Sequence, residues 1–249
     1  MNVFEYLHRI SYTGPTEPTA DVLKAIHRAH MMAVPFENLD IQLGRKIICD
    51  ESSAIHKVVE RRRGGFCYEL NGAFSALLRE LGFKITLLSA RVARQDGSYG
   101  AEFDHLTLRV DLDEPWLADV GFGDSFIEPL RLNVDLEQPQ GKRNFRIVEE
   151  AHSLQMEMAE FAGEWKREYS FTLMPRQLGD FSEMCHYHQT SPQSSFTQKS
   201  VCSMATPSGR ITITDRKLII TQNGKREEST LHTDEEWRAA LRQYFGVVL

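Results

Sequence analysis

The stretch RRRGGFCYELNGAF runs from Arg61 to Phe74 and decides how the first half of the chain is interpreted. Three arginines and two glycines precede a cysteine, and apolar residues at helical spacing follow it. This pattern predicts that Cys67 lies in the first turn of a helix, where unpaired N–H groups and the helix dipole favour a thiolate. Cysteine is also a common core residue, so the stretch alone leaves a packed thiol and a nucleophile equally open.

Helical spacing extends on both sides of this stretch. Apolar residues recur three and four positions apart in four segments, which are residues 3–10, 21–33, 53–63 and 68–83. We expect Thr19 and either Ser52 or Ser53 to act as N-caps, and Gly82 to end the helix that follows Cys67. The first third of the chain is therefore predicted to be helical.

The pattern changes to alternating, β-branched and aromatic runs in the middle of the chain. The predicted strands are residues 84–94, 104–113, 115–122, 143–150, 153–161 and 164–173. Residues 191–196 are predicted to form a loop, and residues 209–230 a β-meander with a turn at Asn223-Gly224. A final helix is expected over residues 233–246, capped by Thr233. Helices followed by strands and a small mixed end indicate an α+β fold.

The composition excludes several classes of protein. The chain has 249 residues and a formal net charge of -6, which argues against nucleic-acid binding. We interpret the arginine run as a cationic cluster that is solvated or lies at a helix C-terminus. Its four cysteines are widely and irregularly spaced, which indicates neither a zinc site nor a disulfide framework. Neither a signal peptide nor a membrane span is expected, so the predicted location is the cytoplasm.

A nucleophilic cysteine requires a histidine base and a group that orients that base. His105 opens a predicted strand, and Asp119 lies in the apolar run WLADVGF, where an unpaired carboxylate is costly to bury. Adjacent strands could place both side chains on one face beside Cys67. We interpret His8, His27, His30 and His56 as surface or core histidines. The cluster Cys185-His186-Tyr187-His188 is too compact for a metal site, so no metal is expected.

Five segments together resemble the arylamine N-acetyltransferase family. They are VPFENLD (34–40), RRGGFCYELN (62–71), HLTLRV (105–110), ADVGFGD (118–124) and TSPQSSF (190–196). The resemblance spans nearly the whole chain, and it implies a Cys67–His105–Asp119 triad in a papain-like core. It also implies an N-terminal helical bundle (1–83) carrying the cysteine, a central β-barrel (84–188) carrying the histidine and aspartate, and a C-terminal α/β lid (189–249).

The same resemblance implies the reaction and its partners. Members of the family transfer an acetyl group from acetyl-CoA, the co-substrate, to an arylamine, arylhydrazine or arylhydroxylamine through an acetylated cysteine. Phe36, Tyr68, Phe122 and Phe196 resemble the aromatic lining of the acceptor pocket. Gly123 resembles a glycine beside the CoA arm. Glu37 and Arg63 resemble a paired acid and base near the site.

Two other enzyme classes use the same triad and stay open at this point. One is a thiol hydrolase or amidase, and the other is an aryl amide synthase that closes a ring. A non-catalytic scaffold is disfavoured because Cys67, His105 and Asp119 are all present. The residues do not distinguish an acetyl donor from a malonyl or propionyl donor, and they name neither the acceptor amine nor the oligomeric state.

Overall fold

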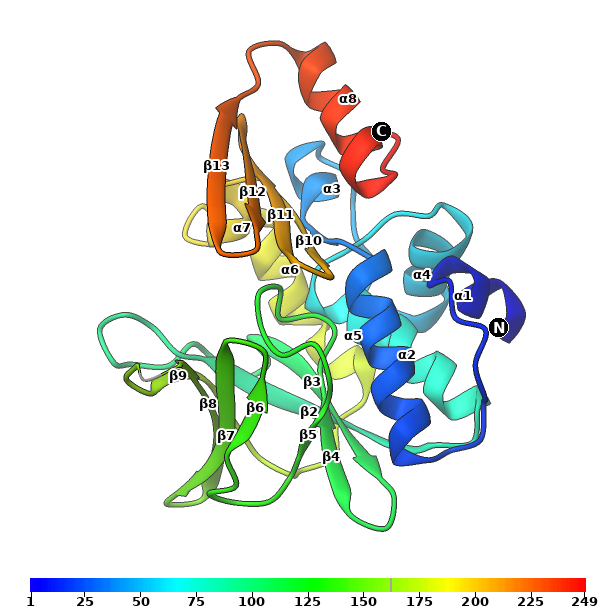
Figure 1. The fold of residues 1–249 in the computed structure, drawn as a ribbon, viewed down its shortest axis with the longest axis vertical. Coiled ribbons are helices and arrows are strands. Elements are labelled where there is room, and N and C mark those ends of the chain that lie inside the picture. The colour runs from blue at the N-terminus through cyan, green and yellow to red at the C-terminus, as the bar shows by residue number, and fades with distance from the viewer. Residues whose placement is uncertain (162) are drawn as a thin grey trace.

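The computed structural model describes residues 1–161 and 163–249, and three layers build it (Figure 1). Helices from the first third of the chain lie to one side of a β-barrel, and a C-terminal sheet with one helix stands over both. The helical elements are α1 (Val3–Arg9), α2 (Ala20–Ala33), α3 (Leu39–Gln42), α4 (Glu51–Ile55), the π-helical turn η1 (His56–Glu60), α5 (Cys67–Glu80), the 3₁₀ turn η2 (Leu178–Phe181), α6 (Ser182–Thr190), α7 (Ser195–Gln198) and α8 (Asp234–Phe245).

Two antiparallel sheets complete the fold. The eight-stranded sheet is a nearly closed barrel with the order β5-β4-β3-β2-β9-β8-β7-β6. Its strands are β2 (Lys84–Val92), β3 (His105–Asp111), β4 (Pro115–Ala118), β5 (Leu130–Arg131), β6 (Gln138–Gln140), β7 (Arg143–Glu150), β8 (Ser153–Glu160) and β9 (Lys166–Phe171). The second sheet has the order β1-β10-β11-β12-β13. Its strands are β1 (Phe36–Glu37), β10 (Val201–Thr206), β11 (Gly209–Thr214), β12 (Lys217–Gln222) and β13 (Lys225–Thr230).

The predicted α+β class and the order of bundle, barrel and C-terminal α/β lid are confirmed. The division at residues 83 and 188 stays a prediction. Thr19 caps α2 through Val22 N–H, as expected, but α4 is capped by Asp50, whose carboxylate accepts from Ser53 N–H at 2.8 Å. The expectation of a serine cap was therefore wrong by two or three residues. The predicted loop at residues 191–196 runs into the short helix α7.

Local chemistry explains where the helices that carry the site begin and end. Helix α2 buries one apolar face and stops at Ala33, because a residue before a proline avoids the helical region and Pro35 follows Val34. Helix α5 is buried along nearly its whole length and packs on β3 and β2. Gly64 lets the backbone that leads into α5 lie close to Pro35, because a Cβ at position 64 would be 1.9 Å from Pro35 O.

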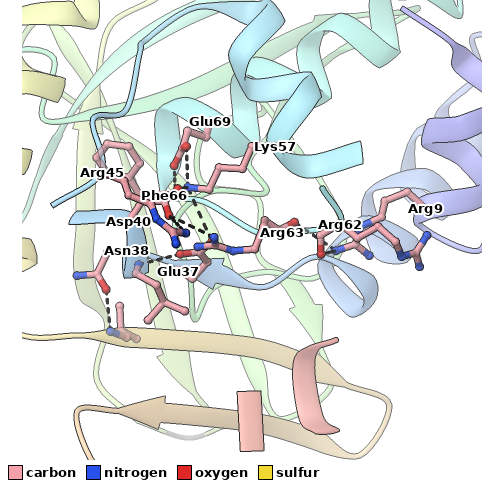
Figure 2. A network of polar contacts seen from close by, with 12 residues as sticks. Arg9, Glu37, Asn38, Asp40, Arg45, Lys57, Arg62, Arg63, Phe66 and Glu69 are labelled. Atoms are coloured by element: carbon pink, nitrogen blue, oxygen red, sulfur yellow. Dashed lines mark hydrogen bonds and ion pairs between the residues drawn. The ribbon is translucent and has the colours of Figure 1, made fainter. Parts of the chain in front are cut away.

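A buried ion network holds this entry in place (Figure 2). Arg63 donates to Glu37 at 2.7 Å and to Asp40 at 3.2 Å, and its side chain is only 2% exposed. Lys57 on η1 contacts Asp40 at 2.9 Å and Glu69 of α5 at 2.8 Å. The predicted Glu37–Arg63 pair is thus present. Arg61 and Arg62 are exposed, as expected for a solvated cluster, but the expectation is wrong for Arg63, which is buried. Two carboxylates offset the cost of burying its charge.

We expect Arg63→Met to lower the free energy of unfolding by about 3 kcal/mol or more, because it leaves buried carboxylates short of a cation. Chemical denaturation measures this change. The matched control is Arg61→Met, which alters an exposed neighbour and is expected to cost less than about 0.5 kcal/mol. Equal stabilities of the two variants would contradict a stabilising role for the network.

Candidate active site

Cys67 is the first residue of α5, as the sequence predicts. The backbone N–H of Phe66 donates to the Glu69 carboxylate at 3.1 Å, which ties the residue before Cys67 to the first turn of the same helix. Cys67 is 4% exposed, and a backbone hydrogen bond from Leu106 reaches its sulfur. The nucleophile candidate therefore lies next to the residue that follows His105.

The surroundings of the Cys67 thiol oppose its ionisation. Burial raises the pKa of the Cys67 thiol well above its ordinary value, and the Leu106 hydrogen bond lowers it only in part. Desolvation thus opposes the effect of the helix N-terminus, which favours a thiolate. A base must take the proton for the thiol to become a nucleophile.

His105 and Asp119 form a buried pair beside it. His105 is the first residue of β3, Asp119 follows β4, and His105 Nε2 lies 2.6 Å from Asp119 Oδ2. Burial by itself would raise the pKa of Asp119, but His105 and further hydrogen bonds hold it below its usual value. The carboxylate is therefore ionised and accepts from Nε2–H, which leaves Nδ1 as the ring nitrogen available to a thiol.

Asn71 connects the pair to the cysteine helix. It lies one turn after Cys67, and its Nδ2 donates to Asp119 Oδ1 at 2.9 Å and to Leu106 O at 2.6 Å. Its Oδ1 accepts from Val120 N–H at 2.9 Å. Gly121 N–H donates to Asp119 Oδ1, also at 2.9 Å. Asn71 was not singled out from the sequence, although it belongs to the CYELN segment.

The backbone of the loop after β4 lies in close contact with α5. A Cβ on Gly121 would lie 2.7 Å from Cys67 Cα and from Asn71 Nδ2, so only glycine fits between the loop after β4 and α5. The structure thus brings Cys67, His105 and Asp119 into one buried centre through Leu106, Asn71 and Gly121. Their catalytic roles remain predictions at this point.

The aromatic residues predicted for the acceptor pocket occupy two different environments. Phe36, Phe122 and Phe196 are partly exposed. The Phe36 and Phe196 ring centroids are 6.1 Å apart, and Phe122 packs edge-on against His105 at 5.1 Å. Gly123 lies against the Phe36 ring. Tyr68 is different, because it is buried and its hydroxyl donates to Phe103 O at 2.8 Å.

Tyr169 of β9 is a further neighbour of the pair that sequence reasoning missed. Its ring lies 5.2 Å from that of His105 and 5.0 Å from that of Phe122. Burial raises the pKa of the Tyr169 hydroxyl, and the Asp119 carboxylate raises it further. The rings of His105, Phe122 and Tyr169 therefore all contact one another.

Residues 185–188 lie on α6, where Cys185 and His188 bind different partners. Cys185 accepts from Gln189 Nε2 at 3.3 Å, and His188 Nδ1 lies 3.2 Å from Ser194 Oγ. Within residues 1–161 and 163–249, no group of three His, Cys, Asp or Glu side chains is arranged to hold a metal ion. Over the same residues, none of the helices has both the length and the apolar character needed to cross a bilayer.

Comparisons with known proteins agree with this arrangement. The family model described as N-acetyltransferase matches residues 19–249. The arylamine N-acetyltransferase pineal gland isozyme NAT-3 of Gallus gallus is 34% identical, over 100% of this chain and 95% of its own length. Proansamycin X synthase of Amycolatopsis mediterranei is 30% identical, over 97% and 96%. The Mycobacterium marinum arylamine N-acetyltransferase in complex with CoA superposes with a TM-score of 0.91 at 31% identity, over 99% and 93%.

We expect Glu69→Gln to change the pH dependence of stability. Burial raises the pKa of Glu69 from 4.5 to about 7, although Lys57 opposes the shift. The folded protein therefore binds this proton more tightly than the unfolded chain, and the stabilisation present at low pH is lost as the pH rises from 4.5 to about 7. The wild type should lose roughly 3 kcal/mol relative to Glu69→Gln across this window.

Denaturant unfolding at several pH values measures this difference. Glu80→Gln, at the exposed end of the same helix, is the control and should follow the wild type. If the free energies of unfolding of the wild type and Glu69→Gln changed in parallel with pH, the pKa of Glu69 would not be raised by folding.

Proposed function

Because this chain belongs to the arylamine N-acetyltransferase family and is an acyltransferase, we propose that it acetylates arylamines, arylhydrazines or arylhydroxylamines in two steps through an acetyl-cysteine on Cys67. The observation that carries the proposal is the buried His105–Asp119 hydrogen bond of 2.6 Å beside the thiol. The similarity to a relative solved with CoA supports acetyl-CoA as the donor.

The first step uses His105 as the base. Nδ1 takes the proton of Cys67, and the sulfur attacks the thioester carbonyl of acetyl-CoA. The new C–S bond forms as the bond to CoA breaks, and the CoA thiolate takes the proton back from the imidazolium. Asp119 stabilises that imidazolium through Nε2. The N–H groups of Cys67 and Leu106 are the candidate donors for the developing oxyanion.

The second step returns the cysteine to its thiol form. The aromatic amine attacks the acetyl-cysteine while His105 takes the amine proton, and Cys67 leaves with that proton. Partly exposed Phe36, Phe122 and Phe196 suit a planar aryl ring, and we propose them as acceptor-binding residues together with Tyr68. Gly123 is proposed for contact with the CoA arm. We also expect the protein to act in the cytoplasm.

A synthase that forms an aryl amide is the second candidate, favoured by the similarity to proansamycin X synthase. A thiol hydrolase would use the same residues but pass the acyl group to water. Release of free CoA from acetyl-CoA separates these functions. Without an amine, a two-step transferase releases at most one CoA per enzyme, whereas a hydrolase turns over continuously. With a simple arylamine, the transferase turns over continuously and a dedicated synthase does not.

We expect Cys67→Ala to reduce arylamine-dependent CoA release by at least about 1,000-fold, since the covalent route is lost. The assay follows free CoA with acetyl-CoA and 5-aminosalicylate. Cys49→Ala, which removes a half-buried thiol of the same core, is the control and should retain wild-type activity. Turnover by Cys67→Ala close to that of Cys49→Ala would refute the assigned nucleophile.

We expect iodoacetamide to alkylate Cys67 at neutral pH faster than the other buried thiols, Cys185 and Cys202. Burial opposes a thiolate, so the advantage depends on proton transfer to His105 and should disappear in His105→Gln. Peptide mapping after short exposures gives the rate at each cysteine. A rate at Cys67 that is unchanged in His105→Gln would show that the histidine is not the base.

A further inference from the structure

His27 touches both ends of the loop that carries the proposed site residues. This side chain projects from α2 and is completely buried. Its Nδ1 lies 2.7 Å from Ile127 O, and Asp119 N–H points to its Nε2 at 3.2 Å. The segment between these contacts, residues 119–127, holds Asp119, Phe122 and Gly123. One imidazole therefore joins the beginning and the end of this loop.

The two hydrogen-bond partners of His27 determine its protonation state and tautomer. A carbonyl oxygen can only accept, so Nδ1 of His27 carries the proton. A backbone N–H can only donate, so Nε2 keeps its lone pair. The imidazole is thus neutral with Nδ1 protonated, in agreement with burial, which lowers the pKa of His27 to about 4. Protonation of Nε2 would remove the acceptor for Asp119 N–H.

Packing keeps the ring in this orientation. The Phe126 ring stacks on it at 5.7 Å, and Phe74 of α5 meets it edge-on at 5.8 Å. His27 is therefore fixed by the helix that carries Cys67 and by the loop that carries Asp119. The backbone of a single loop thus satisfies both nitrogens of this side chain.

We propose that His27 is a positioning residue for the transfer reaction, which fixes the backbone of Asp119 so that its carboxylate points at His105. This inference rests on the proposed function, in which Asp119 supports the His105 imidazolium. Asp119 has no freedom to compensate for a shift of its backbone, because its other oxygen is bound by Asn71 and Gly121. A displacement of about 1 Å at such a pair is enough to slow a reaction by up to about 100-fold.

Three variants separate positioning from general packing. His27→Asn places an amide near Nδ1, so it keeps the bond to Ile127 O but leaves Asp119 N–H without its acceptor. His27→Gln reaches the Nε2 position and restores that acceptor. The matched control is His30→Asn, because His30 is equally buried on α2 and packs on Phe74 at 5.2 Å, but bonds to Tyr6 instead of the loop.

Two readouts are measured for each variant, namely the rate of Cys67 alkylation by iodoacetamide against pH, and kcat and KM for acetyl-CoA with 5-aminosalicylate. We expect His27→Asn to lower kcat and the alkylation rate at neutral pH about 10-fold relative to His30→Asn, with KM within about twofold. His27→Gln should recover most of the loss. Equal effects of His27→Asn and His30→Asn, or no recovery in His27→Gln, would overturn the proposal.

The alkylation rate keeps this test separate from the proposed function, because it needs no acetyl transfer. Nitrogen NMR of the imidazoles in the unmutated protein tests the same contact even if His27→Asn fails to fold. We expect His27 to remain neutral with Nδ1 protonated down to about pH 5. Finding the proton on Nε2 would exclude the bond from Asp119 N–H and overturn the proposal.

Discussion

A single buried carboxylate, Asp119, organises the centre of this molecule. An ionised side chain that leaves water loses several kcal/mol of hydration, and it stays charged only if enough donors surround it. Here the donors come from different parts of the chain, namely Asn71 of α5, His105 of β3 and the backbone of Gly121. Satisfying one anion therefore requires the bundle, the barrel and the loop between them to meet at one point.

Magnitudes decide how the thiol of Cys67 can be activated. The dipole of a helix N-terminus stabilises an anion by about 0.3–2 kcal/mol. The loss of hydration on burial costs several kcal/mol per ion, so desolvation dominates, in agreement with the raised pKa of Cys67. The reactivity of Cys67 therefore depends on the position of a base that can take its proton.

The elements that depend on local pattern could be predicted, whereas those that depend on distant partners could not. Helical spacing located α2 and α5, and the cost of a carboxylate in an apolar run pointed to Asp119. The roles of Asn71 and Tyr169 have no local signal, since each arises from contacts that the chain makes only when folded. The burial of Arg63 has no local signal either, because its neighbours Arg61 and Arg62 are exposed and its carboxylate partners lie more than 20 residues earlier.

The two-residue strand β1 has a consequence for the order in which the protein assembles. It pairs with β10 of the C-terminal sheet, and the side chain of Asn38 beside it binds the backbone of Phe196, Lys199 and Val201. Most of the chain separates these partners, and contacts of such high sequence separation are slow to form. During synthesis on the ribosome, β1 therefore has no neighbouring strand until β10 has been made, so the edge at Phe36 can be covered only late.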